Sequence, residues 1–374
     1  MKKHLLATTA LVAAGMFAMA DSALAQAKVE PVRVSVGGYY AAQIGILDQD
    51  KIGGFSPETV DVQDDAEIHF NGRTTLDNGM TVGFRIELEG ITDTGDQIDE
   101  SYVFTEGAFG RVEIGSLNNV HYRMAYKAPD VYTRGWFNEG NQNDFVRNIT
   151  VAGGSDTTIN TTVPRLADND AEKVNYYTPR IAGFQIGASY VPDQRQDDRS
   201  IALEGDNLGQ GYAVGGNFVR NFGTFDVAAS AGYFAWGDAP AGVDEPSVWS
   251  VGLQVGFGGF RVGGSYGSIS DIGGSFGPAP GTAFTADGTA YDVGASYTFG
   301  PAAVSLTYFN GTVEVDTATS SGDETNSGIA VAGKYTLGPG VSLEAVGSWQ
   351  EIESEILDQK NEAFGVVGAL VLVF

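Results

Sequence analysis

Hydrophobic and polar residues alternate along most of the chain. In the segment 81–90, TVGFRIELEG, apolar residues occupy every even position from 82 to 88. A period of two is typical of a β-strand, because successive side chains leave the strand on opposite faces. One face of this strand is therefore apolar, and the other carries Arg85, Glu87 and Glu89.

The same alternation recurs often enough to predict 16 strands between residues 33 and 374. Seven of the connections are short and contain Gly, Asn or Pro, which supply the positive or fixed φ angles of tight turns. They are centred on Asn78-Gly79, Gly107 to Gly110, Gly183, Gly223, Gly258-Gly259, Gly300-Pro301 and Gly338 to Gly340. The other eight connections are mostly longer and rich in acidic residues. Strands joined in this way are all antiparallel, with both chain ends on the side of the tight turns.

The first 25 residues have the pattern of a secretory signal peptide. A positive start, MKK, precedes an apolar stretch and the small-residue site Ala23-Leu24-Ala25. We predict cleavage after Ala25, with an alternative site after Ala27, and a single domain over residues 26–374. No later stretch reaches the ~18 uninterrupted apolar residues of a spanning helix. We therefore expect an exported protein without a helical anchor.

Composition narrows the class of protein further. Cysteine is absent, so the sequence contains no disulfide or thiolate site. The formal net charge of −26 becomes −27 when residues 1–25, with Lys2, Lys3 and Asp21, are removed. This acidity argues against a nucleic-acid partner, whose phosphates require basic surfaces. It suits a surface that meets water or divalent cations.

These features together predict a closed β-barrel in a membrane. A sandwich of this size would carry bulky side chains on its inner faces and divide into domains. Here the positions opposite the apolar face are often Gly, Ser, Asn, Thr or charged residues, which suit water. Closure pairs every backbone group, as lipid requires, and an even number of strands is typical of such barrels. Seven phenylalanines beside the tight turns predict an interfacial girdle: Phe109, Phe184, Phe222, Phe225, Phe257, Phe260 and Phe299.

Three segments resemble the Gram-negative general porins, in particular the alphaproteobacterial type. They are NGRTTLDNGMTVGFRIELEG (71–90), YYTPRIAGFQIGASY (176–190) and the C-terminal strand with Leu370, Leu372 and Phe374. The resemblance implies a homotrimer of 16-stranded pores in the outer membrane, among lipid and lipopolysaccharide, that passes small hydrophilic solutes and ions. It also implies that the third loop folds into each barrel. One departure is that the last strand is apolar on both faces.

Arginines on the polar faces of the early strands predict a basic patch on one wall of the barrel. They are Arg33, Arg73, Arg85 and Arg111, on the first, second, third and fifth strands. The alternative is scattered charge that only keeps the lumen wet, with acidic neighbours neutralising the arginines. Those neighbours are Glu67, Glu87, Glu89 and Glu113. The porin resemblance, which implies a basic wall opposite an acidic loop, supports the patch and leaves both interpretations open.

Residues 118–171 lack sustained alternation over 54 positions. Loops this long are usually functional or disordered, and the aromatic residues of this one argue against disorder. We predict that it folds inward as the third loop and narrows the pore. Its acids Asp130, Glu139 and Asp144 are predicted to face the four arginines.

An enzymatic function has one candidate motif. GGSYG at 263–267 matches G-x-S-x-G, but it lies within an alternating strand and not on a strand-to-helix elbow. After residue 25 the chain has only two histidines, His69 and His121. We therefore expect Ser265 to be a strand serine and the protein not to be an enzyme. An outer-membrane phospholipase-type barrel, with His69 as its base, is the enzymatic alternative.

The sequence contains no His or Cys spacing and no Ca²⁺ loop that would indicate a metal site. Clustered loop carboxylates could bind divalent cations loosely, and no cofactor is expected. The predicted function is a passive diffusion channel with a modest preference for cations, since acidic loops enrich cations at the entrance. The alternatives are a substrate-selective porin and a structural or adhesive barrel with a closed lumen.

Overall fold

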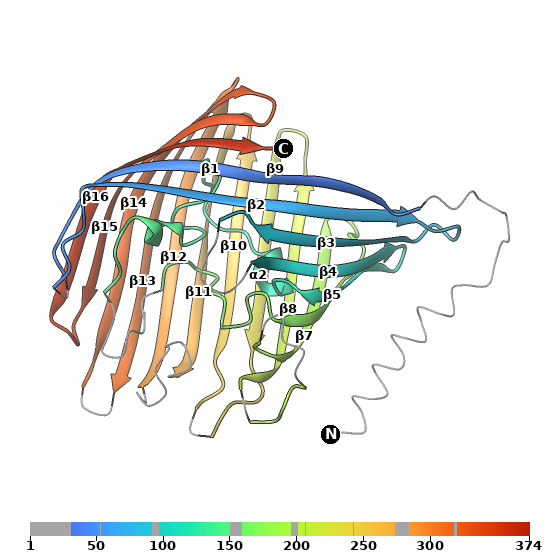
Figure 1. The fold of residues 1–374 in the computed structure, drawn as a ribbon, viewed down its shortest axis with the longest axis horizontal. Helices are drawn as coiled ribbons and strands as arrows, with labels where there is room; N and C mark the ends of the chain where they lie inside the picture. Colours follow the sequence, from blue (N-terminus) through green and yellow to red (C-terminus); the bar gives the residue numbers. More distant parts are fainter. Residues whose placement is uncertain are drawn as a thin grey trace.

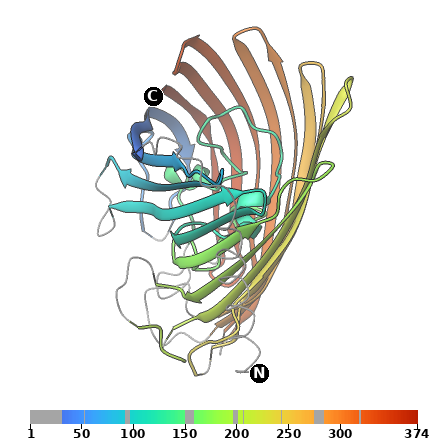
Figure 2. The ribbon, with the colours of Figure 1, turned by 90° about the vertical axis from the view of Figure 1, so that its right-hand side faces the viewer.

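The computed structural model describes residues 31–52, 54–91, 97–149, 159–195, 201–205, 207–241, 243–273, 284–317 and 320–374. The predicted signal peptide, residues 1–25, lies outside the described residues. Sixteen antiparallel strands form one closed barrel, as the alternation predicted (Figures 1 and 2). Each strand pairs with its neighbours in the sequence, and β1 (Arg33–Gln49) pairs with β16 (Gln359–Val373) to close the sheet.

The remaining strands follow one another around the barrel. They are β2 (Val60–Thr75), β3 (Thr81–Glu89), β4 (Ile98–Gly107), β5 (Gly110–Ser116), β6 (Glu172–Tyr177), β7 (Phe184–Asp193), β8 (Gly209–Asn221), β9 (Phe225–Ala235), β10 (Ser247–Phe257), β11 (Phe260–Gly273), β12 (Phe284–Phe299), β13 (Ala302–Thr317), β14 (Ser321–Gly338) and β15 (Val341–Ser354).

Residues 117–171, between β5 and β6, form the third of the longer connections, here called the third loop. It contains the short helix α2 (Val120–Met124) and the 3₁₀ turn η1 (Asn141–Asp144). In the described part of the chain, no helix has both the length and the apolar character needed to cross a membrane.

The seven short connections coincide with the predicted turns and contain between two and six residues each. The turn between β2 and β3 shows why its sequence suits it. Gly79 adopts a φ of 82°, and the Asn78 side chain accepts a hydrogen bond of 3.0 Å from the Met80 amide. Such local bonds stabilise a reversal that a longer side chain at position 79 would strain.

The two faces of the barrel differ as the alternation requires. On β10, Trp249, Val251 and Leu253 are exposed on the outer face, whereas Ser250 between them is buried on the inner face. Neighbouring strands are aligned so that outward-facing residues lie opposite one another. Val251, for example, lies opposite Tyr266 of β11, which is also exposed. A continuous apolar outer face is what lipid contact requires.

The last strand, apolar on both faces, has a defined orientation. Leu370 and Leu372 are exposed on the outside, whereas Val367, Ala369 and Val371 are buried. The three buried residues belong to the same apolar cluster as the aromatic residues of the third loop. The inner face of β16 is therefore apolar because the loop covers it, not because lipid does.

Phenylalanines lie beside the tight turns, as expected for an interfacial girdle. Phe222 and Phe225 stack with ring centroids 4.9 Å apart, and Phe260 stacks on Tyr297 at 4.1 Å. Of the seven predicted residues, six are exposed and Phe109 is half-buried. The exposed six are Phe184, Phe222, Phe225, Phe257, Phe260 and Phe299.

Candidate functional site

The four predicted arginines share one face of the sheet formed by β1 to β5. Arg33 lies directly opposite Arg73, Arg85 lies opposite Tyr102, and Arg111 lies opposite Glu106. Directly opposed residues in an antiparallel sheet project to the same side. The structure therefore brings these arginines to the inner face of neighbouring strands, here called the arginine wall.

Carboxylates of the same wall pair with three of these arginines, Arg73, Arg85 and Arg111. Glu106 accepts from Arg73 at 3.3 Å and from Arg111 at 2.8 Å. Arg111 also pairs with buried Glu113 at 2.7 Å, and Arg85 forms an ion pair with buried Glu87. Of the proposed neutralising acids, Glu87 and Glu113 thus have that role here, and Glu106 joins them. The wall is a mixed charge network and not a purely basic patch.

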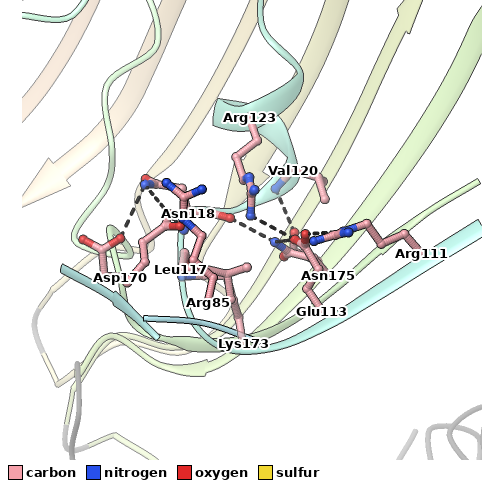
Figure 3. Close-up of polar contacts among 12 residues, drawn as sticks. Arg85, Arg111, Glu113, Leu117, Asn118, Val120, Arg123, Asp170, Lys173 and Asn175 are labelled. Carbon is pink, nitrogen blue, oxygen red and sulfur yellow. Dashed lines mark hydrogen bonds and ion pairs between the residues drawn. The ribbon is translucent and has the colours of Figure 1, made fainter. Parts of the chain in front are cut away.

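The third loop begins with a fixed helix that extends this network. Asn119 caps α2 by accepting a hydrogen bond of 3.0 Å from the Tyr122 amide. The Val120 amide donates to Ser189 of β7 at 2.9 Å. These contacts orient Arg123, which pairs with Glu113 at 2.9 Å (Figure 3). Glu113 therefore accepts from Arg111 of the wall and from Arg123 of the loop.

Lys173 of β6 fixes the root of the third loop. Its buried ammonium donates to the carbonyl oxygens of Asp168, Asn169 and Ala171 at 2.8, 3.1 and 2.6 Å, and it also contacts the Leu117 carbonyl. Leu117 and Lys173 appear together beside Asn118 in Figure 3. One side chain thus binds both ends of the loop.

Further along, the third loop bonds to the inner faces of two opposite strands. The Tyr126 amide donates to Ser230 of β9 at 2.8 Å, and the Tyr132 hydroxyl donates to Gln43 of β1 at 2.5 Å. In the closed strand order β1 and β9 are eight positions apart, which is halfway round. Only five residues of the loop, 127–131, thus separate contacts with strands that are half the barrel apart in the strand order.

Strands between these two points also contact the third loop. His121 shares a hydrogen bond of 2.8 Å with Ser250 of β10, and the Ala128 amide donates to Asp292 of β12 at 3.0 Å. Two glycines allow the backbone of the loop to approach. A Cβ at Gly252 would lie 1.8 Å from the Tyr126 carbonyl oxygen, and one at Gly267 would lie 2.0 Å from that of Thr162.

Aromatic residues give the third loop a core of its own. Trp136 and Phe137 are fully buried. Phe137 stacks on Phe309 of β13 with ring centroids 5.7 Å apart, and Trp136 stacks on Phe145 at 6.4 Å. Burial of aromatic rings of this size contributes strongly to packing. The loop is thus held against the barrel by apolar contacts as well as by hydrogen bonds.

The three predicted loop acids have other partners than the arginine wall. Asp130 accepts from the amides of Tyr132 and Trp136, both at 3.0 Å, and from Ser305 of β13 at 3.1 Å. Glu139 pairs with Lys127 at 2.9 Å and accepts from Tyr122 at 2.7 Å.

Asp144 does lie beside β2, where its carbonyl accepts from Gln63, but its carboxylate pairs with Arg134 at 3.2 Å. Burial raises the pKa of Asp130 and of Asp144 above the ordinary range. Within the described residues, the predicted contact of these acids with the four arginines is thus absent.

The charged side chains of the third loop that pair with the wall are cations, and not the acids that were predicted to do so. Arg134 forms an ion pair with Asp65 of β2, and Arg123 pairs with Glu113 of β5. At these two contacts, positive side chains of the loop face negative side chains of the wall, which is the reverse of the predicted arrangement. The sequence pattern did not point to Arg123 and Arg134, because the conformation of a loop leaves no period in its sequence. It did not point to Lys173 either, because the partners of this strand residue are backbone carbonyls at the two ends of that loop.

Register also gathers Glu67, His69 and Glu87 on the arginine wall. His69 lies opposite Glu87, and its Nε2 is 2.7 Å from Glu67. The turn at Asn78-Gly79 would have revealed this opposition, because antiparallel partners lie at equal distances from the turn. The group forms no motif in the sequence, because its members come from two strands.

Ser265 is a strand serine, as expected. It lies within β11, is buried, and donates to Asp292 at 2.8 Å; its Oγ is 2.5 Å from that of Thr162. The two histidines bond elsewhere, His69 to Glu67 and His121 to Ser250. The described residues thus contain no strand-to-helix elbow at this motif.

A pocket of about 600 Å³ lies between the first connection and the third loop. Its lining includes Glu58, Asp61, Asp144 and Arg147. The Arg147 guanidinium lies 4.0 Å from the centre of the Phe55 ring, an attractive cation–π distance. Both charge signs and an aromatic face thus meet at one place.

Comparison with known proteins agrees with this architecture. An uncharacterized protein of Rickettsia typhi is 25% identical over 208 residues, which cover 49% of this chain and 47% of that protein. A second, of Rickettsia prowazekii, is 24% identical over the same length. The chain spans about half the length of these curated relatives.

Solved structures of similar fold include a porin and an outer membrane protein. The anion-selective porin from Comamonas acidovorans is 18% identical with a TM-score of 0.59, over 92% of this chain and 100% of that one. The trimer form of OmpT from Vibrio cholerae is 13% identical with a TM-score of 0.58, over 92% and 100%. The model of the Gram-negative porin family matches residues 7–353. The chain therefore belongs to the Gram-negative porin family, the β-barrel channels of the outer membrane.

Proposed function

We propose that the protein is a general diffusion porin, a water-filled channel through which small hydrophilic solutes and ions pass passively. In this proposal the third loop lies inside the barrel and narrows the lumen. The observation that carries it is the pair of bonds from Tyr126 to β9 and from Tyr132 to β1. Between these two strands the loop also contacts β12, β13 and β15, so it follows the inner wall and takes up part of the space inside the barrel.

Charge pairing supports a preference for cations over anions. Arg73, Arg85 and Arg111 each have a carboxylate partner, so their attraction for a permeating anion is weakened. The chain as a whole carries a formal charge of −26. An acidic surface around a narrow aqueous path enriches cations there, and this effect declines as salt rises.

A substrate-selective porin is the second candidate. The pocket beside Phe55 and Arg147 favours it, since a pocket with acids, a guanidinium and a ring can hold a polar solute in one orientation. A selective channel would show current steps that its solute blocks at saturating concentration. A general channel would show none for solutes below its size limit.

We also propose that the protein assembles as a homotrimer in outer-membrane lipid with lipopolysaccharide, and that loop carboxylates bind divalent cations loosely. The trimer form of OmpT supports the first of these proposals. Molecular mass of the purified protein in detergent, measured by light scattering, tests it. A monomer at working concentration would contradict it.

Planar-bilayer recording of the purified protein tests the channel itself. We expect large ohmic current steps, and a reversal potential in a KCl gradient that shows modest cation preference. Swelling of liposomes in sugars of increasing size then gives the size limit. A silent protein that is folded and inserted would contradict both kinds of channel and favour a structural barrel with a closed lumen.

A further inference from the structure

Three metal-ligating side chains meet on the inner face of β2 and β3. Glu67 and His69 are two residues apart on β2, and Glu87 lies directly opposite His69 on β3. One ligand atom of each lies within 4.8 Å of the others, and Glu67 Oε2 is 2.7 Å from His69 Nε2. All three are buried or half-buried. One imidazole with two carboxylates is a donor set that suits divalent transition metals.

We propose that Glu67, His69 and Glu87 form a binding site for a divalent transition-metal ion, with Zn²⁺ as the probe, and that the metal displaces Arg85. Bonds of about 2.0–2.2 Å place neighbouring ligand atoms roughly 3–4 Å apart. The present spacing reaches that range by small side-chain rotations, with the two strands unmoved.

Tyr39 of β1 supports the geometry of this site. It lies directly opposite Glu67, and its hydroxyl is 2.9 Å from Glu67 Oε1 and from Asp65 Oδ2. It therefore holds one oxygen of Glu67 and leaves Oε2 toward His69. The Tyr39 ring also meets the imidazole edge-on, with centroids 6.3 Å apart. Contacts of this kind around metal ligands orient them before the ion arrives.

The Arg85 guanidinium supplies a positive charge beside Glu87 and His69. It forms an ion pair with Glu87 and lies 3.1 Å from His69 Nδ1. Because arginine can only donate, Nδ1 accepts this bond, and a neutral imidazole then carries its proton on Nε2, toward Glu67.

A metal on Nε2 requires the proton on Nδ1 instead. The imidazole changes tautomer with no net gain or loss of protons, and Nδ1 can no longer accept from Arg85. Binding therefore releases the guanidinium from His69, and the metal takes its place on the Glu87 carboxylate. A charge of +2 then lies beside Glu87 in place of the +1 of Arg85, and Arg85 becomes free to reach other acids of the wall.

Direct binding measurements test the site without relying on channel activity. Tag-free mature protein in detergent is titrated with Zn²⁺ by calorimetry, in millimolar Mg²⁺ to occupy weak carboxylate sites. Co²⁺ serves as a second probe, since its visible spectrum reports nitrogen and oxygen ligation. We expect one Zn²⁺ bound per chain.

Three variants give the ligand assignment. His69→Gln is expected to weaken Zn²⁺ binding by more than about tenfold. Arg85→Gln is expected to strengthen it, because the competing cation is lost. Asp61→Asn, which removes a carboxylate from the same face of β2 outside the site, is expected to leave it unchanged. Equal Zn²⁺ affinity in wild type and His69→Gln, with both proteins folded by heat-shift electrophoresis, would overturn the proposal. So would weaker binding by Arg85→Gln.

Discussion

Arg134 of the third loop forms an ion pair with Asp65 of β2, and the same guanidinium lies 3.2 Å from Asp144 of its own loop. The Arg134 side chain is largely buried. One loop cation is therefore shared between an acid of the wall and an acid of the loop. Without Arg134, two carboxylates would face each other across the gap.

Replacing Arg134 with glutamine should raise cation preference. Asp65 and Asp144 would then lose their shared cation and attract permeating cations, by roughly twofold in the permeability ratio at 0.1 M salt. The reversal potential in a KCl gradient measures this. Arg147→Gln is the control, since it removes the same charge from the same loop, beside Phe55. Equal shifts in both variants would show that only net charge counts.

Gly252→Ala should loosen the third loop. The added Cβ would lie 1.8 Å from the Tyr126 carbonyl oxygen, so the loop must withdraw from β10. Overpacking of this kind costs about 1–3 kcal/mol. Single-channel conductance should change and become noisier. Gly333→Ala is the matched control, because its Cβ position has open space. Unchanged conductance in a folded Gly252→Ala variant would place the loop elsewhere.

Acid should weaken the contact of the third loop with β10. Burial, with Lys127 nearby, lowers the pKa of His121 from its ordinary value of 6.5 to about 4. A depressed histidine pKa stabilises the folded protein fully above pH 6.5, and this contribution is lost as pH falls toward 4.

The loss should be on the order of 2–3 kcal/mol between pH 7 and pH 4. Thermal denaturation of wild type and His121→Asn across that range isolates it. The difference between the two proteins should vary with pH. If it is constant, His121 does not carry the dependence.

Lys173→Met should destabilise the root of the third loop. Four backbone carbonyls, including those of Asp168 and Ala171, would lose their donor inside the protein. A buried unsatisfied acceptor costs about 1–3 kcal/mol. The temperature at which the folded band disappears in heat-shift electrophoresis should fall. Lys360→Met, which removes an exposed pair with Glu351, should have almost no effect.

Alternation was enough to predict the barrel, because lipid and water impose opposite requirements on the two faces of every strand. The same period placed Arg33 and Arg73 on one face, where register pairs them. The alternation of hydrophobic and polar residues carries no information about the conformation of a loop. The partners of Asp130 and Arg134 therefore could not be derived from the sequence. The aromatic content of the loop did predict order, and Trp136 and Phe137 are fully buried.

The bonds of Tyr126 and Tyr132 to opposite walls also have a mechanical consequence. A hollow cylinder in a bilayer flattens when lateral pressure rises, because its cross-section can become elliptical without loss of any bond between strands. A segment bonded to successive strands around half of the inner wall opposes that deformation. The third loop provides such a lining between Ser230 and Gln43, from within a single chain. The width of this barrel should therefore respond little to the thickness and tension of the membrane around it.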